Sequence, residues 1–144
     1  MYAIALDTGE LRAFGDVQFE TVVAAERRLG IDQRLDMWTL QELLVHVAHG
    51  RDDPDYWPAR AAIRRAVHRS LPPGSEPRLI APNEIQFARL LYDARLPDLE
   101  APIAEMARVG RHIAAAAPED DLQAIQPTLN QTAHHVDTSE RAFA

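Results

Sequence analysis

The 144-residue sequence lacks both cysteine and lysine, and each absence excludes a class of chemistry. Without cysteine there is no disulfide framework, no thiolate metal site and no cysteine nucleophile. Without lysine there is neither a Schiff-base amine nor the lysine of a phosphate-binding P-loop. All 15 basic residues are therefore arginines, which can make bidentate contacts with carboxylates or phosphates.

Long apolar runs are also absent. The first residues show no basic region followed by an apolar run and a cleavage site, and no stretch approaches the roughly 18 to 20 apolar residues that span a bilayer. We therefore expect a cytoplasmic protein with no membrane partner. The 22 acidic residues give a formal charge of −7, which argues against bulk electrostatic binding of nucleic acid but leaves room for a metal site or a small basic face.

The length suits one domain over residues 1–144, and the 24 alanines favour helix. The first fifty residues divide into a strand, a helix, a second strand and a second helix, at residues 2–6, 16–29, 34–38 and 40–49. Gly30 and Gly50 are the stop signals, while Thr39 and Glu42 have the spacing of a capping box. This order of elements predicts parallel pairing of the two strands.

After residue 50 the pattern becomes mainly helical, with a short third strand expected at residues 78–81 and helices at 82–91 and from Asp98 to Pro118. A last helix is expected from Glu119, with a break at Pro127. The predicted fold class is α/β, with a small parallel sheet near the N-terminus and a helix-dominated remainder.

The sequence Asp137-Thr138-Ser139-Glu140 has the form of a further helix cap, yet only four residues follow it. One interpretation is a frayed helix end, and the other is that the sequence is the N-terminal portion of a longer protein.

Two acidic residues form the first candidate site. Asp7 follows the first predicted strand, and Glu42 lies early in the helix after the second. Both would then face the carboxyl edge of a parallel sheet, where α/β proteins build their sites, and two carboxylates there can hold Mg²⁺ or Mn²⁺. The alternative is structural: Asp7 caps the next helix through its side chain, and Glu42 only completes its capping box.

A family resemblance supports the first interpretation and is carried by two segments, ALDTGELRAF at residues 5–14 and LDMWTLQELL at 35–44. They resemble the opening blocks of PIN-domain and PIN-like nucleases, where an aspartate and a threonine follow the first strand and a glutamate lies in the helix after the second. The resemblance covers about the first fifty residues. Gly9 departs from it, because the family typically has asparagine there.

The resemblance implies a metal-dependent ribonuclease that uses Mg²⁺ or Mn²⁺. Asp7 and Glu42 would be the metal ligands, and Thr8 would be a catalytic neighbour that positions water or the first carboxylate. RNA would be the substrate, and an antitoxin-like protein partner and oligomer formation are further possibilities. No later acid follows a recognisable strand, so we expect either an incomplete chain or a degenerate member of the family.

Histidines form the second candidate site. Glu42, His46 and His49 share an arc of about 60° on one helical face, opposite the apolar residues of the same helix. The plain alternative is a solvated polar face. With the His134-His135 pair, this helix is similar to DinB-like four-helix bundles, and the similarity implies a metal bound by three histidines, taken as His46, His49 and His135.

A third candidate is the arginine stripe at positions 60, 64, 65 and 69. Arg60 and Arg64 would hold the phosphate backbone of a nucleic acid, and the alternative is a solvated face that pairs with acidic surface residues. A third class of function also stays open, a helical interaction protein without catalytic activity.

Overall fold

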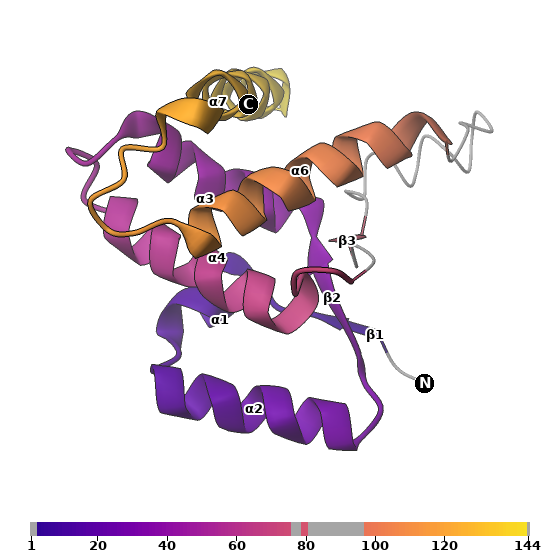
Figure 1. Ribbon diagram of the computed structural model, residues 1–144. Helices are drawn as coiled ribbons and strands as arrows, with labels where there is room; N and C mark the ends of the chain where they lie inside the picture. Colours follow the sequence, from indigo (N-terminus) through magenta and orange to yellow (C-terminus); the bar gives the residue numbers. More distant parts are fainter. Residues whose placement is uncertain (1–2, 76–78, 81–96, 144) are drawn as a thin grey trace.

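The structure is a computed structural model that describes residues 3–75, 79–80 and 97–143. It is mostly helical, with a small parallel sheet formed near the N-terminus (Figure 1), which confirms the predicted fold class. Within the described parts of the chain, no helix combines the length and apolar character needed to cross a bilayer.

The sheet has the order β1-β2-β3, with strands Ala3–Ala5, Asp32–Asp36 and Leu79–Ile80. Both pairs are parallel, and Ala3 lies opposite Asp32. The first two strands pair as expected because the segment between them contains a crossover helix. The second strand begins and ends two residues earlier than predicted, so Asp36 rather than Trp38 is its last residue.

Two helices connect the first two strands: α1 (Thr8–Ala13) and α2 (Asp16–Arg28). Phe19 and Val23 of α2 are buried as its apolar periodicity predicts, but Val17 and Leu29 at its ends are exposed. Gly30 then takes a positive φ of 71°, a conformation that glycine adopts without strain and that ends the helix as expected.

The larger helices are α3 (Met37–His49), α4 (Tyr56–Ser70), α6 (Pro97–Ala115) and α7 (Gln126–Phe143), and the short 3-10 helix η1 (Gln123–Ile125) precedes the last of them. Helix α3 packs against α4 on one side and α7 on another, and α4 also packs against α6 (Figure 1).

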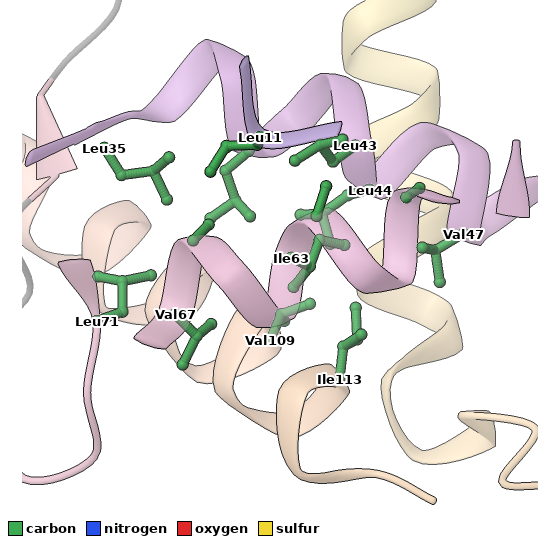
Figure 2. Close-up of a cluster of buried hydrophobic side chains, with 14 of the residues drawn as sticks. Leu11, Leu35, Leu43, Leu44, Val47, Ile63, Val67, Leu71, Val109 and Ile113 are labelled. Atoms are coloured by element: carbon green, nitrogen blue, oxygen red, sulfur yellow. The ribbon is translucent and has the colours of Figure 1, made fainter. Parts of the chain in front are cut away.

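The core lies where α3, α4 and α6 meet, and Figure 2 shows its aliphatic side chains pointing toward one another. Leu43 and Leu44 of α3, Ile63 of α4, and Val109 and Ile113 of α6 are fully inaccessible to solvent. The apolar face predicted for α3 is therefore confirmed. Because this face turns inward, the opposite face of α3 lies nearer to solvent.

Three predicted helix boundaries need correction. The N-cap of α3 is Asp36, whose carboxylate accepts from the Trp38 N–H at 2.7 Å, and Thr39 is buried inside the helix. Consequently Glu42 lies in the second turn and does not complete a capping box there.

The last helix begins at Gln126, so Pro127 lies in its first turn, where its missing N–H is tolerated, and does not break it. The same helix continues through Asp137, which therefore starts no new helix. The helix expected at residues 82–91 lies outside the described residues.

Candidate metal centre

Two histidines and an aspartate meet where α3 ends and the chain turns toward α4. His46 and His49 are three residues apart and therefore lie on the same side of the last turns of α3. Gly50 ends the helix with a φ of 91°, and this turn brings Asp53 back toward the two histidines. The Asp53 N–H donates to the Gly50 carbonyl at 3.0 Å, which closes the turn.

The three side chains converge on a single oxygen atom. The Nδ1 atoms of His46 and His49 each lie 3.0 Å from Oδ2 of Asp53. One potential ligand atom from each residue lies within 4.8 Å of the other two. The Asp53 side chain is only 11% exposed, against 32% for His46 and 55% for His49, so the carboxylate lies beneath and the rings stand closer to solvent.

The Asp53 carboxylate is fixed in place by its second oxygen. Oδ1 accepts from the Asp55 N–H at 2.8 Å, and the Asp53 carbonyl accepts from the Tyr56 N–H at 3.0 Å. This Asx turn leads into α4 and leaves Oδ2 for the histidines. A carboxylate oriented through its other oxygen is the arrangement that typically supports a metal ligand.

Hydrogen bonding also determines the protonation state of this carboxylate. The backbone N–H of Asp55, followed by the side chains of His46 and His49, holds the pKa of Asp53 far below its usual range. Asp53 is therefore ionised at neutral pH, as a metal-binding carboxylate must be.

The dimensions of the cluster fit a metal ion. Two atoms that each lie about 2.1 Å from one ion are about 3.0 Å apart at a right angle and about 3.4 Å apart at a tetrahedral angle. The observed separations of 3.0 Å between Nδ1 and Oδ2 agree with this range. Two imidazoles and a carboxylate can therefore hold a metal ion here, which would displace any proton on the ligand atoms.

The predicted acidic pair has a different environment. The Asp7 carboxylate accepts from the Glu10 N–H at 2.7 Å, and the Glu10 carboxylate accepts from the Asp7 N–H at 3.2 Å, which forms a capping box on α1. The structural alternative for Asp7 is thus observed. The Thr8 hydroxyl is buried without a hydrogen-bond partner among the described residues. Within the same residues, the one group of three or more potential ligands is His46, His49 and Asp53, which includes neither Asp7 nor Glu42.

The arginine stripe also needs correction. Arg60 is fully buried and donates to the carbonyls of Ala117 at 3.1 Å and Asp120 at 3.4 Å, so it is not exposed to a backbone phosphate. Arg69 is buried as well, in an ion pair with Glu26. Arg64 is exposed and lines a surface pocket between α2 and α4. The two buried arginines therefore belong neither to a phosphate-binding stripe nor to a solvent-exposed one.

The structure separates the predicted histidines. His46 and His49 belong to the cluster, whereas His135 lines a cleft between α3, α6 and α7. His134 and His49 line another surface cavity, but His134 is not part of the metal-binding group.

Sequence reasoning missed Asp53 because it followed the polar face of a single helix, and Asp53 lies beyond Gly50, where that helix ends. The signal that would have found it is the spacing His-x-x-His-x-x-x-Asp from 46 to 53, across the glycine.

Comparison with protein-family models, curated proteins and solved structures gave no match for this chain. Any proposal about function therefore rests on the geometry of the cluster.

Proposed function

We propose that the protein binds a divalent first-row transition metal through His46, His49 and Asp53. The observation that carries the proposal is the convergence of two imidazole nitrogens on one ionised carboxylate oxygen at 3.0 Å. The hydrogen bond from the Asp55 N–H supports it, because this bond orients the carboxylate independently of the histidines.

The donor set favours some ions over others. Imidazole nitrogen suits Zn²⁺, Fe²⁺, Ni²⁺ and Cu²⁺, whereas Mg²⁺ prefers oxygen ligands alone. Of the two ions expected from the sequence, Mn²⁺ is therefore the better candidate for this site and Mg²⁺ the poorer one. Three protein ligands leave coordination positions for water, and a metal ion in such an open site can activate water or polarise a substrate.

The proposal is tested by calorimetric titration of the metal-free protein with Zn²⁺, Mn²⁺ and Mg²⁺. We expect one ion per chain and Zn²⁺ the tightest of the three. Asp53→Asn and His49→Ala should each weaken Zn²⁺ binding by more than the roughly 10- to 100-fold typical of residues that only support a ligand. Equal Zn²⁺ affinity in the parent and in both variants would contradict the proposal.

Two matched controls accompany these variants. Asp52→Asn removes a neighbouring exposed carboxylate, and His135→Ala removes the histidine that the sequence analysis placed at the metal. Both should keep the parental affinity. Loss of binding in His135→Ala would instead favour the three-histidine hypothesis.

A ribonuclease of PIN-like type is the second proposal, and the arrangement of β1, β2 and Asp7 supports it. The two strands are parallel, and Asp7 comes two residues after β1 ends, near the carboxyl edge of the sheet. The test is cleavage of single-stranded RNA with Mn²⁺ by the parent and by Asp7→Asn. Cleavage that the substitution abolishes would support it, and cleavage that it leaves unchanged would exclude Asp7 from the chemistry. An antitoxin-like partner and oligomer formation stay predictions.

A further inference from the structure

A surface cavity with a volume of about 440 Å³ lies between α3 and α7, beside the metal-binding cluster. Its lining consists of three apolar and three polar residues: Val45, Ala133 and Val136, with His49, His134 and Asp137. His49 therefore belongs both to this cavity and to the group that can hold a metal ion. The shared histidine makes the cavity an immediate neighbour of the proposed metal centre.

The two helices that form the cavity are joined close to it. Helices α3 and α7 pack against each other (Figure 1), and the side-chain amide of Gln126, the first residue of α7, donates to the Ala48 carbonyl at 3.4 Å. Ala48 directly precedes His49 in the sequence. The wall that α7 contributes is therefore attached to the turn of α3 that carries the metal-binding histidine.

The position of His49 also determines how the ion and the cavity are related. An ion about 2.1 Å from Nδ1 lies within about 4.5 Å of every atom of the same imidazole ring. The Asp53 side chain is 11% exposed and that of His49 is 55% exposed, so the coordination positions that the protein leaves open lie on the solvent side, beside His49. A molecule that coordinates the ion can therefore pass this ring and reach the cavity with a short arm.

The lining of the cavity favours an uncharged, partly apolar occupant. Val45 and Ala133 are half-buried and keep accessible apolar surface, whereas Val136 is buried and closes the wall. The carboxylate of Asp137 disfavours an anionic group by charge repulsion. A cavity of about 150 Å³ is enough to hold benzene, so there is room for an aromatic ring.

We propose that the cavity between α3 and α7 holds the apolar arm of a small molecule that coordinates the metal ion at His46, His49 and Asp53. The molecule has an oxygen donor for the ion, such as a carbonyl or hydroxamate oxygen, and an uncharged arm of about the size of a phenyl ring. This inference rests on the proposed metal centre, and it gives that centre a preference among ligands that the three protein ligands alone do not provide.

The test compares two hydroxamates that coordinate Zn²⁺ through the same pair of oxygen atoms. Acetohydroxamate ends in a methyl group, whereas 3-phenylpropanohydroxamate carries a phenyl ring on a two-carbon linker. In calorimetric titration of the Zn²⁺-loaded full chain, the phenyl compound should bind about tenfold more tightly, because part of its ring leaves water. Backbone amide shifts of the ¹⁵N-labelled protein should differ between the two compounds at Val45, Ala133 and Val136.

Ala133→Phe places a ring of the protein in the cavity. It should remove the preference for the phenyl compound, while the affinities for Zn²⁺ and for acetohydroxamate stay at the parental values. Ala24→Phe, at an exposed position of α2, is the matched control and should keep the preference.

The ion and the two hydroxamates report on different claims. A parent protein that binds no Zn²⁺ would overturn the metal centre and, with it, the role of the cavity. If Zn²⁺ binds but the phenyl compound is not preferred, or if its additional shifts miss the cavity, only the role of the cavity is overturned. Both results come from the parent protein, so neither depends on how well a variant folds.

Discussion

Two carboxylates, near opposite ends of α4, bind basic side chains in different ways. Near its C-terminal end, both oxygens of Glu26 are taken by one guanidinium: Arg69 Nε donates to Oε1 and Nη2 donates to Oε2, each at 2.8 Å. Near its N-terminal end, Oδ2 of Asp53 alone meets two imidazoles, while Oδ1 accepts a backbone N–H. The first pair is nearly inaccessible, whereas the histidines of the second are accessible to solvent.

The buried pair also joins several elements. Arg69 donates to the carbonyls of Ile4 in β1 at 2.8 Å and Arg34 in β2 at 2.7 Å, while Glu26 belongs to α2. The guanidinium therefore links the sheet to two helices, and its donors are satisfied by protein acceptors. Arginine keeps its proton at any ordinary pH, but histidine does not. We conclude that the Glu26 pair is structural, whereas the Asp53 cluster has solvent-accessible histidines and could hold a metal ion.

The largest expected effect is a loss of stability when the buried Glu26–Arg69 pair is broken. Arg69→Met leaves Glu26 buried without its partner and two strand carbonyls without a donor, so we expect a loss of about 3–5 kcal/mol in the free energy of unfolding. Arg64→Met, at an exposed position of the same helix, should change it by less than about 0.5 kcal/mol. Urea unfolding measures both, and equal effects would refute the distinction between these two arginines.

Metal binding should stabilise the protein only through the Asp53 cluster. Zn²⁺ at about 100 times its Kd is expected to raise the free energy of unfolding by about 2.7 kcal/mol in the parent protein. In Asp53→Asn the same ion concentration should have almost no effect. Thermal unfolding with and without Zn²⁺ measures the gain, and an equal gain in the variant would place the ion elsewhere.

Acid should act differently on the metal affinity of the Asp53 cluster and on the stability contributed by Glu26. Zn²⁺ affinity is expected to fall as the pH is lowered, by up to about 100-fold per pH unit, because two protons compete with the ion for the imidazole nitrogens. The Arg69 hydrogen bonds lower the pKa of Glu26 from 4.5, so the stability that this carboxylate contributes is fully present above pH 4.5 and is lost as the pH falls below it.

Zn²⁺ titrations at pH 7, 6, 5 and 4 measure the fall in metal affinity, and urea unfolding at the same pH values measures the fall in stability. If stability in the absence of metal falls between pH 7 and 6 as steeply as metal affinity does, the two regions are not independent.

The smallest expected effect concerns Asp7, the aspartate favoured by the sequence. Asp7→Ala removes the cap of α1 and should cost about 1 kcal/mol, while Asp7→Asn retains a capping oxygen and should cost much less. Zn²⁺ affinity should stay at the parental value in both variants. If Asp7 were a ligand of the tightly bound ion, both substitutions would lower that affinity strongly, and calorimetry would detect it.

Local patterns predicted much of the fold. The apolar residues of α3 face the core as their helical spacing indicates, and β1 and β2 pair in parallel, as their order with the crossover helix predicts. The predicted N-cap of α3 was wrong because Asp36 and Thr39, three positions apart, are both good capping residues. Only the point where β2 ends decides between them.

The sequence predicted only part of the metal-binding cluster, because the position of its third residue depends on a turn. His46 and His49 share a helical face that periodicity reveals, but Asp53 lies beyond Gly50, and its position depends on the turn. Charge pattern also failed for Arg60, because its acceptor at Ala117 lies 57 residues away in sequence. Contacts of this kind depend on tertiary packing and leave no periodic trace in the sequence.

The most direct test of the central claim is an anomalous-difference map at the zinc absorption edge, from crystals grown with one equivalent of Zn²⁺. The account predicts a single strong peak about 2.1 Å from Nδ1 of His46, Nδ1 of His49 and Oδ2 of Asp53. A peak beside Asp7 and Glu42, a peak at His135, or no peak in the protein would contradict it.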